Sequence, residues 1–225
     1  MRGLFVTGTD TGVGKTVVGA AICAALVARG EQVAAFKPAV TGLEEASGDW
    51  PRDHDLLAQA AGGGQAAEQV TPYRYGPALS PHYAAELAGE TIDPARLLSM
   101  VRSTGDRLLV AEGVGGLMVP ITSGYLVRDL AVDLGLPVLV AARSGLGTIN
   151  HALLTVEAAR AAGLRVAGII MTPWPHEPEP IEQSNRETVE RLSGVAVSGL
   201  PPTSLGELAQ AGEALPLDDW LRWAG

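Results

Sequence analysis

Glycines, a lysine and a threonine near the N-terminus form a pattern that could bind a nucleoside triphosphate. The segment is Gly8-Thr9-Asp10-Thr11-Gly12-Val13-Gly14-Lys15-Thr16. Phosphate oxygens need several converging N–H groups, and glycines let the backbone curl closely enough to supply them. Lys15 would reach the terminal phosphates as a point charge, and the Thr16 hydroxyl would hold Mg²⁺. The loop carries one residue more than the strict pattern, because Gly8 stands one position too early.

The residues on either side of this loop predict the elements that position it. The apolar run over 4–6 predicts a strand, and the helical spacing of apolar residues over 17–26 predicts a helix. The first turn of that helix would add free N–H groups and the positive end of its dipole. A merely tight turn between strand and helix would not need a lysine and a threonine to open the helix. We therefore favour a phosphate loop.

A second lysine follows a second predicted strand. Residues 32–36 are a short apolar run that follows the first helix after a tight turn, which favours a parallel sheet. Ligands of open α/β sheets bind beyond the carboxyl ends of the strands. Lys37 is thus placed at the same edge as the phosphate loop, although its position fits a solvated lysine equally well.

Glu112 stands at the end of another predicted strand. Residues 107–111 are nearly all apolar, and Gly113-Val114-Gly115-Gly116 follow the glutamate. An apolar strand that ends in an acid is where nucleotide hydrolases and transferases keep a carboxylate directed at Mg²⁺. The glycines would leave room for a substrate. We expect Glu112 to help hold the metal, with a plain residue at a strand end as the alternative.

Two further acids open a predicted helix over 53–61. Asp53 and Asp55 could each complete a Mg²⁺ site, because Mg²⁺ prefers hard oxygen ligands, or could merely cap the helix. His54 lies between them. No Cys/His spacing supports a transition-metal site, so we expect His54 at the surface.

The rest of the chain alternates between apolar runs that predict strands and segments with the apolar spacing of a helix. Further strands are expected at 137–142, 166–171 and 195–200, and further helices at 83–88, 94–103, 126–134, 152–156 and 181–192. The turn after 137–142 is rich in glycine and enters a helix, with Thr148 or Asn150 as its cap. This second helix N-terminus could receive a carboxylate. The pattern predicts an α/β fold, with a mainly parallel sheet and helices on both faces, as one domain over 1–225.

Composition excludes several partners. The chain has 25 acidic and 16 basic residues, a net charge of −9 and no basic cluster, so we expect neither nucleic acid nor an anionic membrane as a partner. No apolar run approaches the roughly 18 residues that span a bilayer. Cys23 is the one cysteine, which fits a reducing compartment. We expect a soluble, cytoplasmic protein.

Taken together and in order, these motifs resemble the dethiobiotin synthetase family. The matching segments are the phosphate loop with its extra residue, Lys37-Pro38, Thr41-Gly42, Ser80-Pro81-His82, Glu112-Gly113, Gly115-Gly116 and Gly147-Thr148-Ile149-Asn150-His151. The resemblance implies a P-loop NTPase-like fold and a homodimer. It also implies that 7,8-diaminopelargonate, CO₂ (supplied as bicarbonate) and ATP or another nucleoside triphosphate give dethiobiotin, with Mg²⁺ as the cofactor.

The resemblance also implies a role for each matching residue. Lys15, Lys37 and Thr41 would act in catalysis, and Thr16, Asp55 and Glu112 would hold Mg²⁺. The substrate would lie against Thr11, Lys37, Thr41, Gly115 and Gly116, with Gly147, Thr148 and Asn150 binding its carboxylate across the dimer interface. The nucleotide would contact Thr9, Asp10, Thr11, Gly12, Val13, Gly14, Lys15, Thr16, Glu112, Thr172, Pro173 and Pro201.

One departure from the family pattern concerns the nucleotide base. Family members commonly place an asparagine after the strand at 166–171, where this chain has Thr172-Pro173. A hydroxyl cannot make the paired donor and acceptor contacts of an amide. We therefore expect weaker discrimination among nucleoside triphosphates.

Three other classes fit less well. Partitioning-type ATPases carry a second lysine where this chain has Asp10, and many end in a basic amphipathic helix that is absent here. Amide-forming ligases of the cobyrinate type need a glutaminase domain with a nucleophilic cysteine, and Cys23 is wrongly placed for that role. A non-catalytic nucleotide-binding module is the remaining alternative.

Overall fold

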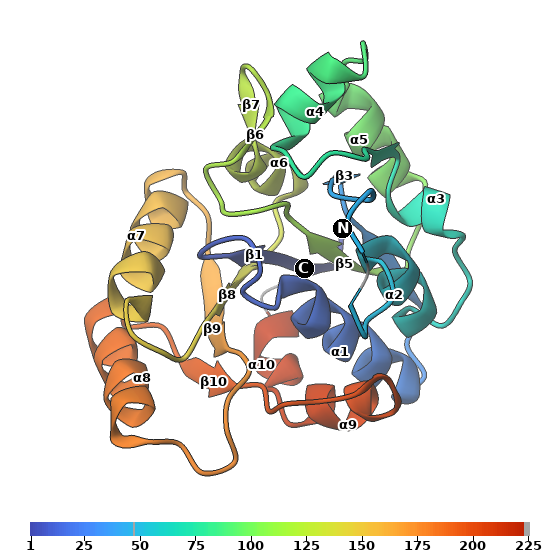
Figure 1. Ribbon diagram of the computed structural model, residues 1–225. Helices are drawn as coiled ribbons and strands as arrows, with labels where there is room; N and C mark the ends of the chain where they lie inside the picture. The colour runs from blue at the N-terminus through green and yellow to red at the C-terminus, as the bar shows by residue number, and fades with distance from the viewer. Residues whose placement is uncertain (47, 223–225) are drawn as a thin grey trace.

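A parallel six-stranded sheet forms the centre of the computed structural model, which describes residues 1–46 and 48–222 (Figure 1). Its order is β10-β9-β8-β1-β5-β2. The strands are β1 (Gly3–Gly8), β2 (Val33–Phe36), β5 (Leu108–Glu112), β8 (Val138–Ala142), β9 (Val166–Met171) and β10 (Val197–Gly199). Because β1 lies between β5 and β8, the loops that follow these three strands meet at one edge. The predicted mainly parallel α/β sheet is confirmed.

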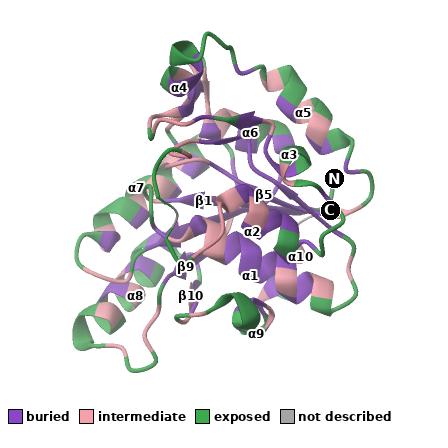
Figure 2. Ribbon diagram, turned by 45° about the vertical axis from the view of Figure 1, so that its right-hand side comes forward, coloured by how far each residue is buried: buried purple, intermediate pink, exposed green. Residues whose placement is uncertain are grey.

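Alternate residues of the central strands face two separate cores. Phe5 faces one core with α4 (Pro81–Leu87), α5 (Pro94–Arg102), α6 (Val127–Leu134), α7 (Thr148–Ala161) and α8 (Pro180–Ser193). Leu4 and Val6 face the other core with α1 (Lys15–Ala28), α2 (Asp53–Ala60), α3 (Ala67–Val70), α9 (Leu208–Glu213) and α10 (Leu217–Leu221). Figure 2 shows the buried strands between these two layers. Burial on both faces explains why the strands are continuously apolar.

Several short elements were not predicted. β3 (Ala39–Val40) pairs in parallel with β4 (Tyr73–Arg74), and β6 (Pro120–Thr122) pairs antiparallel with β7 (Tyr125–Leu126). A 3-10 turn, η1 (Leu205–Glu207), precedes α9. Strands of two or three residues are too short to carry a readable period, so their pairing defines them: β3 pairs with a distant segment, whereas β6 and β7 form a local hairpin. Within the described part of the chain, no helix is long and apolar enough to span a bilayer.

The start of α7 differs from the sequence prediction. Gly147, with φ of 91°, is its N-cap, and neither Thr148 nor Asn150 caps it. A positive φ is accessible to glycine at little cost, so the turn closes at that residue and the helix begins one position later.

Candidate nucleotide and substrate site

The glycine loop curls tightly between β1 and α1. Gly12 and Gly14 have φ values of 69° and 87°, and Gly14 is the N-cap of α1. A Cβ atom on Gly14 would lie 2.7 Å from Cγ2 of Thr172, and one on Gly8 would lie 2.8 Å from Cγ2 of Val13. Only glycine fits these two positions without displacing a neighbour. The loop therefore leaves the first N–H groups of α1 facing the open edge, as an anion site requires.

Lys15 lies beneath this loop. Its side chain is buried, and its Nζ atom donates a hydrogen bond to the carbonyl oxygen of Asp10, 2.8 Å away. Burial lowers the pKa of Lys15 below its ordinary value of 10.5, an effect that the charge of Glu112 opposes and that of Lys37 reinforces. The ammonium is thus held against the loop and directed toward the space where phosphates would lie.

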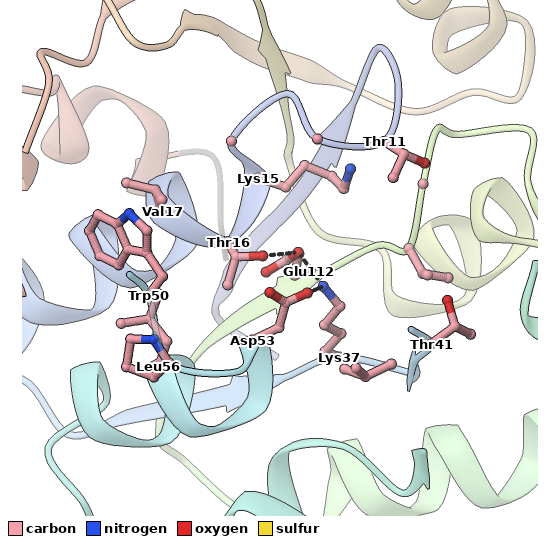
Figure 3. A pocket seen from close by; sticks show the side chains of 16 residues that line it. Thr11, Lys15, Thr16, Val17, Lys37, Thr41, Trp50, Asp53, Leu56 and Glu112 are labelled. Atoms are coloured by element: carbon pink, nitrogen blue, oxygen red, sulfur yellow. Dashed lines mark hydrogen bonds and ion pairs between the residues drawn. The ribbon is translucent and has the colours of Figure 1, made fainter. Parts of the chain in front are cut away.

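Lys37 faces the same space from β2. Its Nζ atom lies 2.7 Å from Oε1 of Glu112 and 2.5 Å from Oδ2 of Asp53. The Thr16 hydroxyl donates to the same Glu112 oxygen at 2.9 Å. Figure 3 shows the Lys37 ammonium beside the two carboxylates, with the Lys15 side chain above them in this view. Lys37 is therefore directed inward, which settles the alternative that the sequence left open.

The charges of this cluster shift one another's pKa values. Burial would lower the pKa of Lys37, but the Glu112 and Asp53 carboxylates outweigh it, so the pKa lies above the ordinary value. Burial likewise opposes ionisation of Asp53, yet Lys37 and the Thr16 hydroxyl hold its pKa below the usual range. Burial raises the pKa of Glu112 against the attraction of Lys37. The result is a charged Lys37 bound to an ionised Asp53.

The outer edge of β2 has no neighbouring strand in the described chain, and the side chain of Gln65 forms hydrogen bonds with its backbone instead. Gln65 accepts from the Ala35 N–H at 2.7 Å and donates to the Ala35 carbonyl at 3.2 Å. Both backbone groups are thereby satisfied at an unpaired sheet edge. This contact fixes β2 two residues before Lys37.

The cluster lines a cavity of about 360 Å³ at the carboxyl edge of the sheet. Lysine and carboxylate side chains form its floor, and Val17, Trp50 and Leu56 form an apolar wall on one side (Figure 3). The remaining lining residues are Thr11, Gly12, Gly14, Lys15, Thr16, Lys37, Val40, Thr41, Pro51, Asp53, Glu112, Val114 and Gly115. Two cations and a glycine loop in one cavity can hold a triphosphate and neutralise charge that develops on it.

Relatives with a known name resemble this chain over most of its length. ATP-dependent dethiobiotin synthetase of Anaeromyxobacter dehalogenans is 44% identical over 195 residues, which is 86% of each chain. The chain belongs to the dethiobiotin synthetase family. The family's enzyme from Bacillus subtilis subsp. natto is 38% identical and covers 90% of this chain, which in turn covers 87% of that protein. The enzyme from Rhodococcus erythropolis is 40% identical, and the match covers 90% of this chain and 88% of that protein. A family model described as an AAA domain also matches residues 2–205.

Solved structures confirm the P-loop NTPase fold at much lower identity. A ParA family ATPase from Chlorobium tepidum superposes with a TM-score of 0.53 and 12% identity, covering 100% of this chain and 99% of that one. The cell division ATPase MinD of Pyrococcus furiosus superposes with a TM-score of 0.53 and 17% identity, and the match covers 100% of this chain and 97% of that one. At these identities the likeness concerns the fold alone. The dethiobiotin synthetase family is therefore assigned from sequence, and the predicted resemblance is confirmed.

The structure places Asp53, not Asp55, beside the residues that the family pattern assigns to Mg²⁺. Asp53 contacts Lys37 and lines the cavity, whereas Asp55 is not among the lining residues. Asp53 is the first residue of α2, and a position two residues later points about 200° around the helix axis. The expectation of His54 at the surface is wrong, because its side chain is buried.

Three oxygen-bearing groups fit a magnesium ion. Thr16, Asp53 and Glu112 offer hydroxyl and carboxylate oxygens, the hard ligands that Mg²⁺ takes alongside water and phosphate. Oε2 of Glu112 is buried and has no hydrogen-bond partner among the described residues. No group of three or more His, Cys, Asp and Glu side chains in the described residues could hold a metal by itself. The donor set thus suits a hard cation that shares its coordination with a nucleotide.

The structure brings together most residues expected at the substrate. Thr11 and Thr41 both line the cavity, and Figure 3 shows Thr41 on the opposite side of Lys37 from Trp50. Gly115 has φ of 63°, and a Cβ atom on it would lie 3.5 Å from Oγ1 of Thr11. A Cβ atom on Gly116 would lie 3.5 Å from the carbonyl of Gly8. These glycines therefore let the loop after β5 approach the phosphate loop.

The turn at Gly147, Thr148 and Asn150 does not line this cavity. Gly147 and Asn150 are exposed, and the Thr148 hydroxyl is buried without a hydrogen-bond partner in the described chain. Leu146, beside them, is 92% exposed. The expectation that this turn binds a substrate carboxylate across a dimer interface stays a prediction.

The residues expected near the nucleotide base lie on the other side of the phosphate loop. Thr172 is buried against Gly14, and a cis peptide bond joins it to Pro173. Pro201 follows β10 and is partly exposed. The hydroxyl of Thr172 stands where the family's base-reading asparagine is expected.

Sequence reasoning missed Trp50 and Gln65. Trp50 forms part of the apolar wall, and Gln65 holds β2. Trp50 lies in an irregular polar segment, so no periodic pattern identifies it. Gln65 follows a run of glycines, and its contact with Ala35 is fixed by tertiary structure alone.

Proposed function

We propose that this protein is an ATP-dependent dethiobiotin synthetase acting in biotin biosynthesis. It would join CO₂ to the two amines of 7,8-diaminopelargonate and hydrolyse one triphosphate for each ureido ring formed. The observation that carries the proposal is the convergence of Lys15 and Lys37 in one cavity with the glycine loop. The names of relatives that are 38–44% identical support the same substrates.

The chemistry proceeds through charges that this cavity can stabilise. One substrate amine adds to CO₂ and loses a proton, which gives a carbamate. A carbamate oxygen attacks the γ-phosphorus and the diphosphate leaves, which gives a carbamic-phosphoric mixed anhydride. The second amine attacks the carbonyl carbon, loses a proton and expels inorganic phosphate. The carbamate is already anionic, so no side chain is needed as the base for its attack.

The two lysines carry the electrostatic part of the reaction. Phosphoryl transfer and ring closure both gather negative charge on the transferred phosphoryl group, and Lys15 and Lys37 line the cavity that would hold it. Preorganised charges of this kind lower the barrier because they need no rearrangement during the reaction. The Thr41 hydroxyl would donate to the carbamate, and Thr11 with the backbone of Gly115 would flank the substrate.

Thr16, Asp53 and Glu112 would hold Mg²⁺. When bound, the ion neutralises phosphate oxygens and polarises the γ-phosphoryl group. The Lys37 ammonium lies between the two carboxylates of this set. We assign Asp53 rather than Asp55 to this set because Asp53 faces Thr16 and Lys37.

A homodimer would complete the substrate site. Among the described residues that line the cavity, Lys15 and Lys37 are the basic side chains, and both would face the phosphates rather than a distant carboxylate. The exposed turn from Gly147 to Asn150 would supply backbone N–H groups to the carboxylate bound in the partner.

Product analysis tests the proposal. The protein is incubated with diaminopelargonate, bicarbonate, Mg²⁺ and ATP, and the products are separated by mass. Dethiobiotin and one phosphate for each dethiobiotin are expected, and Lys37→Met is expected to abolish both. ATP binding without any dethiobiotin would instead identify a nucleotide-binding module.

A further inference from the structure

Hydrogen bonds from α8 hold the turn between β8 and α7. Nδ2 of Asn185, on α8, donates to the carbonyl oxygens of Ser144 at 2.9 Å and Gly145 at 3.1 Å. Asn185 is 6% exposed. One buried amide thus satisfies two consecutive carbonyls of a turn that is 40 residues away in sequence.

This contact reaches the first residue of α7. The Gly145 carbonyl that accepts from Asn185 also accepts from the Thr148 N–H at 3.3 Å. Thr148 opens α7 after the left-handed Gly147. Fixing Gly145 therefore fixes the direction of the free N–H groups at the start of this helix.

A second contact from α8 reinforces the first. The Ser144 hydroxyl lies 3.1 Å from Oε1 of Glu182 and 3.4 Å from the carbonyl of Pro173, and can donate to either. The other oxygen of Glu182 accepts from the Glu179 N–H at 2.9 Å and closes the first turn of α8. The start of α8 and the turn after β8 are therefore held as one unit.

Burying the side-chain amide of Asn185 would destabilise the fold if the amide had no hydrogen-bond partner. Val189, one helical turn later on the same face of α8, is fully buried in the apolar core. An apolar side chain at position 185 would continue that face, whereas a buried amide is tolerated only when hydrogen-bonded. The two carbonyls of the turn account for the amide.

We propose that Asn185 is a positioning residue for the substrate. It holds Ser144 and Gly145 so that the N-terminus of α7 presents its N–H groups to the carboxylate of diaminopelargonate. The inference rests on the proposed function, which assigns that carboxylate to this turn. Asn185 itself touches neither the phosphate loop nor Lys37.

Two variants and a matched control test the proposal. Asn185→Ala removes the amide, and Asn185→Asp keeps the size but replaces the donor by an acceptor. Gln183→Ala is the control, because Gln183 is an exposed residue on the same helix whose side-chain amide donates to the Pro178 carbonyl at 3.0 Å and not, among the described residues, to the turn after β8. Steady-state dethiobiotin formation and hydrogen exchange of the peptide over 143–151 are measured for each protein.

The expected pattern separates positioning from stability. Losing the two bonds should raise KM for diaminopelargonate about tenfold in both Asn185 variants, with kcat and KM for ATP changed less than about twofold. The 143–151 peptide should exchange faster in these variants. Gln183→Ala should match the wild type in both measurements.

Other outcomes overturn the proposal in distinguishable ways. An unchanged KM for diaminopelargonate, or an equal rise of both KM values, would show that Asn185 does not act on the substrate. Unchanged exchange at 143–151 would show that it does not hold the turn. Absence of dethiobiotin from the wild-type protein would overturn the proposed function, and this inference about the substrate with it, whatever the exchange result.

Discussion

The Nζ atom of Lys37 lies 2.7 Å from Oε1 of Glu112, although the two residues are 75 positions apart. Glu112 is fully buried, and Lys37 is 4% exposed. The same ammonium contacts Asp53, so a protein cation lies among the oxygens that we assign to Mg²⁺. The carboxylates thus have a counter-ion before any metal or nucleotide binds.

Removing that ammonium should therefore favour binding of a free metal ion. Lys37→Met removes the ammonium that contacts both Asp53 and Glu112, and we expect Mn²⁺ to bind the nucleotide-free protein about tenfold more tightly than it binds the wild type. Electron paramagnetic resonance of unbound Mn²⁺ measures this. Lys15→Met is the matched control, since Lys15 bonds to the Asp10 carbonyl instead of a carboxylate. Equal or weaker binding by Lys37→Met would contradict the arrangement.

The two aspartates at the start of α2 should differ in their effect on the metal. Asp53→Asn should raise the Mg²⁺ concentration that gives half-maximal activity about tenfold or more, because it removes a ligand charge. Asp55→Asn, the same change on the other side of the helix, should leave it near the wild-type value. Titrations of activity against Mg²⁺ at saturating ATP compare the two. A larger rise in the Mg²⁺ requirement for Asp55→Asn than for Asp53→Asn would identify Asp55 as the ligand instead.

The two lysines should titrate on opposite sides of the ordinary value. The chain contains no other lysine, so ¹³C-labelled lysine gives two side-chain signals by NMR. Burial lowers the pKa of Lys15 below 10.5, whereas the charges of Glu112 and Asp53 raise that of Lys37 above it. The spectrum of Lys37→Arg retains one lysine signal, which is thereby assigned to Lys15. Two coincident midpoints at 10.5 would contradict the charge arrangement.

These shifts also fix the sign of the linkage to stability. Above the folded pKa of Lys15 and below 10.5, the folded chain binds fewer protons at Lys15 than the unfolded chain, so the contribution of Lys15 to stability rises with pH. The contribution of Lys37 is fully present below 10.5 and is lost as pH rises through its higher folded pKa.

Gly14 should be required for nucleotide binding beyond its effect on the backbone. Gly14→Ala forces a left-handed alanine, at about 1–2 kcal/mol, and puts its Cβ atom 2.7 Å from the Thr172 methyl group. Gly30→Ala is the matched control, with φ of 86° and nothing within 4 Å of the added atom. We expect both variants to unfold at lower temperature, and Gly14→Ala alone to lose ATP binding. Normal ATP affinity in Gly14→Ala would contradict the role of the loop.

The nucleotide base should be weakly selected. Thr172 offers one hydroxyl where the family commonly has an asparagine amide, so ATP should be preferred over CTP and GTP by less than about a hundredfold. Competition of CTP and GTP with ATP in dethiobiotin formation measures the preference. A preference above that value would show that other groups read the base.

The sequence predicted the parts of the site that follow strands, because a strand end fixes where its next side chain lies. The phosphate loop, Lys37 and Glu112 all come directly after apolar runs and meet in the cavity. Asp53 and Asp55 could not be separated, because a shift of one residue in the start of a helix turns every side chain by about 100°. Contacts between distant segments, such as Asn185 with Ser144, leave no local pattern.

The cap of α7 shows a second limit. Thr148 and Asn150 are residue types that cap helices, yet Gly147 adopts the positive φ and ends the turn first. Residue type gives a preference among caps, whereas the backbone conformation of the turn decides which residue caps the helix.

The central claim is that a carbamate made from CO₂ attacks the γ-phosphoryl group bound between Lys15 and Lys37. It is tested most directly by following ¹⁸O from labelled bicarbonate during a short reaction with diaminopelargonate and ATP. The account predicts one labelled oxygen in each inorganic phosphate released, in step with dethiobiotin, because the oxygen that attacks phosphorus stays with the phosphate when the ring closes. Phosphate that carries oxygen from water and none from bicarbonate would contradict it.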